Sequence, residues 1–242
     1  MRTVTDTQEG NDDLWRTDLA RRVFDVIMSG VLIVTTAPIV IILAIASAIS
    51  FRAGPIFFQE RVGKGGENFC CWKIRTLPTS VPLFTDKFDL ANYEISTFWR
   101  IVRRRHLDEL PQLVLVFIGR MSMVGPRPEM QYLHDGMDTR FRGLRTSVRP
   151  GCTGLWQVSE GSAGLITASP KYDSFYIEHR SLRFDLWISL HTARTMLGIG
   201  SPIGLDDIPD WVTPRTGIAA DRRVIIDLRD RAPERVSVDA RP

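Results

Sequence analysis

The chain has 242 residues, 44% hydrophobic and 24% charged, and its formal net charge is +3 at pH 7. These values are those of an ordinary globular chain with one or two domains and a core of reasonable size. The small net charge argues against nucleic acid as a partner. Three cysteines, two of them adjacent, provide no disulfide framework and indicate a reducing, cytosolic setting.

The N-terminal region is expected to approach a membrane surface. Residues 1–13 are polar and acidic and are interpreted as a loose leader. Residues 14–22, LWRTDLARR, place Trp15 beside three arginines, a combination that suits the headgroup layer of a bilayer. We therefore predict an interfacial helix in this segment.

Residues 23–51 form the most apolar part of the chain, with Asp25 as the one charged residue in twenty-nine positions. The run is too long for the apolar region of a signal peptide, and it is apolar around the whole helix circumference rather than along one stripe. It therefore predicts a membrane segment. Pro38 removes a backbone hydrogen bond near the centre and leaves two pieces of about fifteen residues, each shorter than the roughly 20 needed to span a bilayer.

Basic residues flank this run at both ends: Arg16, Arg21 and Arg22 before it, and Arg52, Arg61 and Lys64 after it. Counting positive charges places both flanks in the cytosol. We therefore expect a re-entrant helix–break–helix with Pro38 at the break. Ser29, Thr35 and Thr36 are candidates to satisfy the backbone groups that the proline frees.

Two local patterns follow the membrane segment. Residues 54–76 hold short apolar and aromatic runs on either side of GKGG, which predicts a β-hairpin with a glycine turn. A phosphate-binding loop is the alternative, but its characteristic residue spacing is absent. After a variable loop over 78–94, one helix is expected from about 95 to 105. A second is expected from near Asp108 to Gly119, a glycine suited to the end of a helix.

Pro and Gly mark two further segments, 121–128 (MSMVGPRP) and 148–158 (VRPGCTGLWQV), as rigid, exposed loops of the kind that carry sites. Helices are expected around 129–146 and 170–200, the latter amphipathic enough to lie on a membrane surface. The predicted class is thus α+β and mainly helical. Its expected parts are a leader (1–13), an interfacial and re-entrant membrane helix (14–52), a small cytosolic domain with a β-hairpin and surface amphipathic helices (53–204) and a flexible tail (205–242).

The segment RRRHLDELPQL, residues 103–113, places Asp108 and Glu109 between three arginines and an apolar helix. In one interpretation Asp108 is the N-cap and Glu109 lies in the first turn. In the other, the same helix end binds phosphate, since one carboxylate does not need three guanidinium groups to neutralise it. These residues alone leave both interpretations open.

Several motifs in order, LDELPQL, MSMVGPRP and VRPGCTGLWQV after a proline-interrupted apolar run, resemble the bacterial sugar transferase family, the monotopic polyprenyl-phosphate phosphoglycosyl transferases. The resemblance covers roughly residues 20–195. It implies transfer of a sugar 1-phosphate from a nucleotide diphosphate sugar, usually a UDP-sugar, to polyprenyl phosphate. It also implies the cytoplasmic face of the bacterial inner membrane, a membrane-lipid environment, and the first membrane step of exopolysaccharide, O-antigen or glycan assembly.

The resemblance further implies that Asp108 attacks the β-phosphorus and holds the phospho-sugar as an acyl phosphate, which the lipid phosphate then displaces. Covalent catalysis of this kind divides one difficult transfer into two simpler displacements. Anion attacking anion requires positive charge, supplied by Mg²⁺ and by arginines. The implied metal ligands are Asp108 and Glu109, and Glu109 either holds the metal or helps the acceptor phosphate.

Arg103, five residues before Asp108, is the first candidate for a phosphate ligand. The other candidates for phosphate or nucleotide contacts, with ordinary surface positions as their alternative, are Arg127, Arg149, Lys73 and Arg75. Arg104 and Arg105 either join them or face lipid headgroups. His106 is interpreted as a headgroup or packing residue rather than a catalyst.

One departure from the family pattern concerns residues 157–170, QVSEGSAGLITASP, which lack the arginine that many relatives carry after QV. The identity of the sugar therefore stays open, as do the polysaccharide pathway and the oligomeric state. The alternative function is a non-catalytic, membrane-anchored scaffold for polysaccharide assembly. It predicts damage to the carboxylate pair or to the Gly-Pro motifs, and neither is visible.

Overall fold

The computed structural model describes residues 4–82 and 93–212, with side chains described from residue 18 onward. The α-helices are α1 (Val4–Phe51), α2 (Thr97–Arg104), α3 (Gln112–Phe117), α4 (Gln131–Asp135), α5 (Thr139–Thr146), α6 (Leu155–Val158), α7 (Lys171–His179) and α8 (Leu182–Leu197). The strands are β1 (Ile56–Val62), β2 (Asn68–Ile74), β3 (Ser122–Val124) and β4 (Gly151–Thr153), and the 3₁₀ turns are η1 (Lys64–Gly66), η3 (Leu107–Glu109), η4 (Glu160–Ala163), η5 (Ile166–Ala168) and η6 (Leu205–Asp207). The described chain is thus mainly helical with two small sheets.

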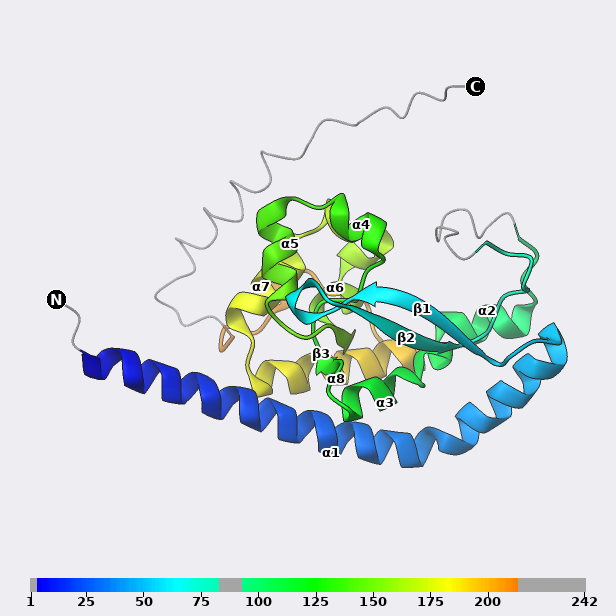
Figure 1. The fold of residues 1–242 in the computed structure, drawn as a ribbon, viewed down its shortest axis with the longest axis horizontal. Helices are drawn as coiled ribbons and strands as arrows, with labels where there is room; N and C mark the ends of the chain where they lie inside the picture. Colours follow the sequence, from blue (N-terminus) through cyan, green and yellow to red (C-terminus); the bar gives the residue numbers. More distant parts are fainter. Residues whose placement is uncertain (1–3, 83–92, 213–242) are drawn as a thin grey trace, which may run out of the picture.

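The N-terminal helix α1 is one bent helix rather than two helices separated by a break. Its helical backbone continues from Val4 through Pro38 to Phe51. Figure 1 shows it running along one side of the molecule and then curving away from its first direction. The segment expected as a loose leader is helical from Val4 onward. A proline removes one ladder hydrogen bond, which bends a helix while the turns on either side keep theirs.

Hydroxyl groups before the proline contribute to this bend. Thr35 and Thr36 each donate a hydrogen bond to the backbone carbonyl four residues earlier, at 2.9 and 2.6 Å, and Ser29 does the same at 2.5 Å. None of these bonds reaches the carbonyl of Val34, which is the one that the missing N–H of Pro38 leaves free. The expectation that they satisfy this group is therefore wrong. Such back-bonding instead favours bending of the helix.

Little of the described part of α1 is buried. Residues Asp18–Phe51 are long and apolar enough to cross a membrane by length and composition, with a mean hydropathy of 2.6 in the most apolar window. Only 11% of that window is buried, so α1 is not the enclosed core helix of the described fold. Its exposed apolar side chains include Leu19, Val23, Ile27, Val31, Val34, Ile41, Ile45 and Ile49.

α1 is attached to the rest of the molecule on both sides of its bend. Before the bend, the Asp25 carboxylate accepts hydrogen bonds from Ser122 Oγ and from the Met123 N–H, both at 2.8 Å, where β3 begins. After the bend, Ser47 Oγ donates to the Arg75 carbonyl at 2.7 Å, just past the end of β2. A small apolar cluster surrounds this second contact: Leu43, Ile74, Trp99 and Val102.

The predicted β-hairpin is present. β1 and β2 pair antiparallel, with Ile56 opposite Ile74 and Val62 opposite Asn68. The turn between them holds Gly65 at φ +73° in the left-handed region, where glycine is favoured because it has no Cβ. In Figure 1 the hairpin lies across the molecule between α1 and the layer formed by α4 and α5.

The two Pro- and Gly-rich segments are buried rather than exposed, which corrects the sequence interpretation. Each contains a short strand, and β3 and β4 pair in parallel, with Ser122 opposite Gly151 and Val124 opposite Thr153. The glycines serve this close packing, since a Cβ on Gly151 would lie 2.1 Å from the backbone nitrogen of Gly125. The segments are therefore rigid because they form part of the interior.

Both long helical stretches expected toward the C-terminus are divided. The first becomes α4 and α5, because the Asp138 side chain accepts from the amides of Arg140 and Phe141 and starts a new helix. The second becomes α7 and α8, with Ser181 capping α8 through the amide of Phe184. The variable loop over 78–94 falls partly, and the tail from 205 mostly, outside the described residues.

Candidate functional site

Asp108 and Glu109 lie in η3, between α2 and α3. His106, immediately before this turn, adopts a left-handed conformation at φ 53°, which ends α2 and redirects the chain. Asp108 caps no helix, because α3 begins only after Pro111 and η3 has no side-chain cap. The capping interpretation of Asp108 is therefore wrong. Gly119, at φ +87°, does follow the end of α3 as expected.

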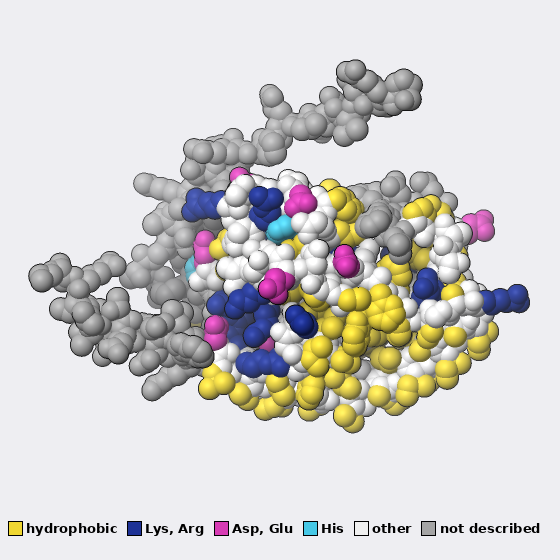
Figure 2. Space-filling model, viewed as in Figure 1, with side chains coloured by type: hydrophobic (Ala, Val, Ile, Leu, Met, Phe, Trp, Pro, Cys, Tyr) yellow, Lys and Arg dark blue, Asp and Glu magenta, His cyan; other side chains and the backbone are white. Residues whose placement is uncertain are grey.

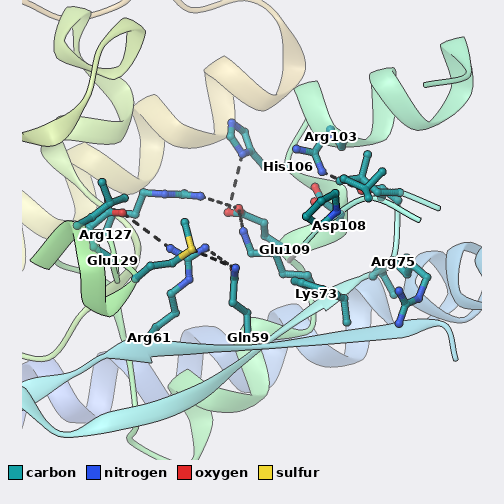
Figure 3. Close-up of a pocket in the computed structure, with 18 of the residues that line it drawn as sticks. Gln59, Arg61, Lys73, Arg75, Arg103, His106, Asp108, Glu109, Arg127 and Glu129 are labelled. Carbon is teal, nitrogen blue, oxygen red and sulfur yellow. Dashed lines mark hydrogen bonds and ion pairs between the residues drawn. The ribbon is translucent and has the colours of Figure 1, made fainter. Parts of the chain in front are cut away.

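The carboxylate pair lines a cavity of about 390 Å³ (Figure 3). The hairpin provides one wall, with Phe57, Gln59 and Arg61 at alternate positions of β1 and Lys73 on β2. The remaining titratable side chains at its surface come from other segments: Arg75, Arg103, His106, Asp108, Glu109, Arg127, Glu129 and Tyr132. A cavity of this size is in the range of small-molecule sites.

Glu109 is held by two cations. Its Oε1 atom accepts from Lys73 Nζ at 2.7 Å and from Arg127 Nη2 at 3.2 Å, and its side chain is 10% exposed. Burial alone would raise the pKa of this carboxyl, but Lys73 and Arg127 outweigh burial and hold the pKa well below its usual range. Glu109 is therefore ionised, and its charge is already compensated by the protein.

Asp108 has the opposite environment. It is buried, and its Oδ1 atom has no hydrogen-bond partner among the described residues. Burial, together with the negative charge of Glu109, raises the pKa of Asp108 to about 6, against the smaller opposing effect of Lys73 and Arg103. At neutral pH the carboxyl is therefore ionised and presents an uncommitted oxygen beside the cavity. Buried oxygens without a partner are rare, and they often mark sites of chemistry.

Four of the five predicted cationic ligands meet in this cavity. Arg103 donates to Thr76 Oγ1 at 3.1 Å and forms no ion pair with a described carboxylate. Arg75 donates to the Gly54 carbonyl and lies over the Phe57 ring. Lys73 and Arg127 bind Glu109, as described above. Arg149 is the exception, because it lines a different and much smaller cavity.

Three features of the site were not expected. Arg61 lies 3.8 Å from Glu129 Oε2 and donates to the Pro128 carbonyl, which joins the hairpin to the segment after β3. The alternation of residues 57, 59 and 61 on the strand is the pattern that indicates Arg61. Trp156 Nε1 is a buried donor with no partner within residues 4–82 and 93–212, and its residue lines the cavity. Residues 164–167, inside the segment that departs from the family pattern, line the same wall.

His106 lies with its Nδ1 atom 3.9 Å from Glu109 Oε2, and its side chain is 53% exposed. Figure 3 shows the ring directed toward Glu109, at the edge of the labelled group. His106 thus makes a peripheral contact with Glu109. Its interpretation as a headgroup or packing residue stays a prediction.

The two carboxylates fit a hard divalent cation such as Mg²⁺. Oxygen ligands are what Mg²⁺ prefers, and Asp108 Oδ1 is an unsatisfied buried oxygen that a cation would complete. Within residues 4–82 and 93–212, no group of three or more His, Cys, Asp or Glu side chains could hold a metal. Water and substrate phosphate would therefore fill the rest of the coordination shell, as is usual for Mg²⁺.

Residues 16–198 match the family described as bacterial sugar transferase. Among similar proteins, the exopolysaccharide production protein ExoY of Rhizobium meliloti is 31% identical over 195 residues, which cover 72% of this chain and 84% of ExoY. The UDP-glucose:undecaprenyl-phosphate glucose-1-phosphate transferase of Caulobacter vibrioides is 34% identical over 192 residues, 74% of this chain and 70% of the relative.

Other relatives are longer. The undecaprenyl-phosphate galactose phosphotransferase of Salmonella typhimurium is 31% identical over 198 residues, which cover 73% of this chain but 40% of that protein. The chain thus spans less than half the length of some relatives, and residues 16–198, which match the family, contain most of α1, the hairpin and the carboxylate pair. On the match over residues 16–198 and these relatives, the chain belongs to the bacterial sugar transferase family.

Proposed function

We propose that this protein transfers a sugar 1-phosphate from a nucleotide diphosphate sugar, most simply a UDP-sugar, to polyprenyl phosphate. The observation that carries the proposal is Asp108 in the lining of a cation-rich cavity, with a buried Oδ1 atom that has no partner among the described residues. The printed names of the relatives support the same reaction class, since two of them name undecaprenyl phosphate together with glucose or galactose transfer.

In the first step, the Asp108 carboxylate attacks the β-phosphorus of the donor. A bond forms between the carboxylate oxygen and phosphorus, the bond from that phosphorus to the bridging oxygen breaks, and the nucleoside monophosphate leaves with the electron pair. In the second step, an oxygen of polyprenyl phosphate attacks the same phosphorus and Asp108 leaves as a carboxylate. No proton transfer is required at the nucleophile, because its pKa of about 6 leaves it ionised at neutral pH.

The cations have separate tasks in this scheme. Lys73 and Arg127 pair with Glu109 and offset its charge, which lowers the repulsion between this carboxylate and the donor diphosphate. Arg103 forms no described ion pair and is the side chain that we assign to the diphosphate, since guanidinium binds phosphate oxygens in a bidentate way. When bound by Asp108 and Glu109, Mg²⁺ would add positive charge at the diphosphate.

Both substrates have to meet at a membrane surface. We propose that α1 enters and leaves the cytoplasmic leaflet as a re-entrant helix bent at Pro38. The bend and the exposed apolar surface of α1 support this arrangement, as do attachments to the folded domain on both sides of the bend. Exposed apolar side chains on other helices extend the same surface: Phe98, Ile101, Phe117, Ile118, Leu186 and Leu190. Figure 2 shows apolar side chains along the lower edge of the molecule, where α1 runs in Figure 1.

The test is release of nucleoside monophosphate from a panel of UDP-sugars by purified protein with Mg²⁺ and polyprenyl phosphate. Asp108→Asn should reduce the rate by at least about 10³-fold, because the amide is a poor nucleophile. EDTA should stop the release and Mg²⁺ should restore it. The panel also identifies the sugar.

The matched control is Asp138→Asn, at a helix cap far from the cavity in sequence, which should keep near-normal turnover. A phospho-sugar adduct trapped on a residue other than Asp108 would contradict the nucleophile assignment. No release with any nucleotide sugar, from protein that remains folded, would instead favour the non-catalytic scaffold.

A further inference from the structure

A second cavity lies against residues 18–25 of α1. Its volume is about 30 Å³, and its charged lining comes from four regions of the chain: Asp18, Arg21, Arg22 and Asp25 of α1, Lys64 of the hairpin turn, Arg149 before β4, and Arg180 after α7. No residue lines both this cavity and the larger one that contains Asp108. Figure 2 shows Lys and Arg side chains gathered on the face above the first half of α1.

Two of these charged groups hold the fold together. Arg22 donates to the Val116 and Phe117 carbonyls at 2.7 and 2.6 Å, where a cation satisfies the free carbonyls at the end of α3. Asp25 is buried and accepts hydrogen bonds from the start of β3. These two side chains shape the cavity floor but offer little binding capacity of their own.

The remaining cations are incompletely used. Arg21 binds Asp185 through Nε and Tyr176 through Nη2, yet its buried Nη1 atom has no partner among the described residues. Arg149 and Lys64 have no ion pair with a described carboxylate. Arg180 has only a 3.5 Å contact with Asp18, whose side chain is 60% exposed. The cavity thus combines an unsatisfied buried donor with three cations that are weakly paired or unpaired.

The size and charge of the cavity select the ligand. About 30 Å³ holds a few water-sized groups, which suits one phosphate and excludes a nucleotide. Its α1 residues lie at the start of the apolar segment Asp18–Phe51. With α1 in the membrane as proposed above, the cavity lies at the level of the lipid headgroups. Guanidinium groups recognise phosphate oxygens at such a position, and clustered basic residues beside a membrane helix attract acidic lipids.

We propose that this cavity binds the phosphate of an anionic phospholipid of the surrounding membrane. Arg21 Nη1 and Arg149 contact the phosphate oxygens, and Lys64 and Arg180 close over them from the hairpin turn and from the link between α7 and α8. The site fixes the height of the folded domain above the bilayer, separately from the sugar-transfer cavity. It neither requires nor supplies a substrate of the transfer reaction.

The test is thermal unfolding of the full chain in micelles of a neutral maltoside detergent, titrated with dihexanoyl-phosphatidylglycerol or dihexanoyl-phosphatidylcholine. Phosphatidylglycerol should raise the unfolding temperature in a saturable way, since a ligand that binds the folded state stabilises it. Phosphatidylcholine should raise it much less. Lys64→Gln with Arg149→Gln should weaken the apparent affinity for phosphatidylglycerol by at least about tenfold, through loss of two charge-assisted contacts.

The matched control is Arg140→Gln with Arg142→Gln on α5, which removes the same charge away from α1 and should leave the titration unchanged. The single change Lys64→Gln lies in an exposed turn and does not threaten folding. It should also weaken the affinity for phosphatidylglycerol relative to the unaltered protein. Equal responses to both lipids, or an unchanged titration in the Lys64 and Arg149 variant, would overturn the proposal. Inorganic phosphate matching phosphatidylglycerol at equal concentration would overturn the lipid assignment. These readouts do not depend on sugar transfer.

Discussion

At the scale of single residues, two adjacent carboxylates have opposite roles because their partners differ. Glu109 is paired with Lys73 and Arg127, while Asp108 keeps a buried oxygen that has no partner in the part of the chain that the structure describes. Folding stabilises the negative charge of Glu109 and destabilises the negative charge of Asp108. An arrangement in which one group is stabilised at the expense of its neighbour is typical of sites that trade stability for reactivity.

Replacing Asp108 by Asn should therefore stabilise the metal-free protein. Its pKa is raised from 3.8 to about 6 in the folded state, so the ionised carboxylate costs roughly 2–3 kcal/mol at pH 8. The full cost applies above the pKa that Asp108 has in the folded state, and it disappears below the pKa that it has in the unfolded state. The stability gained by Asp108→Asn should therefore vanish as the pH falls from 6 toward 4. Thermal unfolding in EDTA at several pH values measures it.

Asp185→Asn is the control for this measurement. Asp185 also has a pKa raised to about 6 by burial, but it accepts hydrogen bonds from Arg21 and Tyr176. Its replacement leaves the buried Arg21 charge without its carboxylate, so it should destabilise the protein. If Asp108→Asn lowered the unfolding temperature as well, the oxygen of Asp108 would have a partner that the structure lacks.

Lys73 should be coupled to Glu109. Lys73→Met removes one of two cations from a buried carboxylate and should destabilise the protein by about 2 kcal/mol, less than for an ion pair with a single cation. Glu109→Gln in the same background should recover part of the loss, with a coupling energy of about 1–3 kcal/mol. Arg75→Gln, which removes another cation from the same cavity without a described carboxylate partner, is the control. Additive effects of the Lys73 and Glu109 changes would count against the pair.

Trp156 should act in substrate binding through its free N–H. Trp156→Phe keeps an aromatic ring but removes the buried donor, and the loss of one hydrogen bond should lower kcat/KM by roughly tenfold. We expect the change mainly in KM for the nucleotide sugar. The control is Trp187→Phe, on α8 and outside the cavity lining. Unchanged KM in Trp156→Phe would exclude this contact.

At the scale of elements, α1 combines a bend with two attachments to the domain. A straight helix would have to release either the contact of Asp25 with β3 or that of Ser47 with the end of β2. The bend is thus tied to the position of the hairpin, which forms one wall of the cavity. The bend of α1 therefore leads to a prediction about the topology of the chain in the membrane.

Both ends of the chain should lie in the cytosol. Single cysteines at Gln8 and Asp230, in a background without Cys70, Cys71 and Cys152, should resist an impermeant thiol reagent in intact cells and react after the cells are opened. Pro38→Ala restores the missing backbone donor and should straighten α1, exposing the Gln8 probe in part of the population. Labelling of the Gln8 probe from outside in the unaltered helix would establish a full span instead.

At the scale of the whole molecule, apolar and cationic surfaces are arranged around α1. Exposed apolar side chains of α2, α3 and α8 extend the apolar surface of α1, and the small basic cavity lies at the start of that surface. The larger cavity, with Asp108, is formed between the hairpin and the segments after α2 and β3. The fold thus separates a surface suited to lipid from a cavity suited to a charged, soluble substrate.

Local patterns in the sequence determined much of this organisation. The proline-interrupted apolar run predicts a membrane segment, and the short apolar and aromatic runs on either side of GKGG predict a hairpin, while the phosphate site at Asp108, Glu109 and Arg103 stays a prediction. Each of these inferences depends on residues that are close together in the chain. Their outcome therefore depends little on how distant segments pack.

The tertiary structure alone decided which charges meet. Arg127 and Arg149 occur in similar Pro- and Gly-rich segments, yet the first pairs with Glu109 and the second lines the basic cavity. Lys73 reaches Glu109 only because the hairpin folds back over η3. An ion pair depends on distances of a few ångströms between residues far apart in the chain, and those distances exist only once the chain has closed around them.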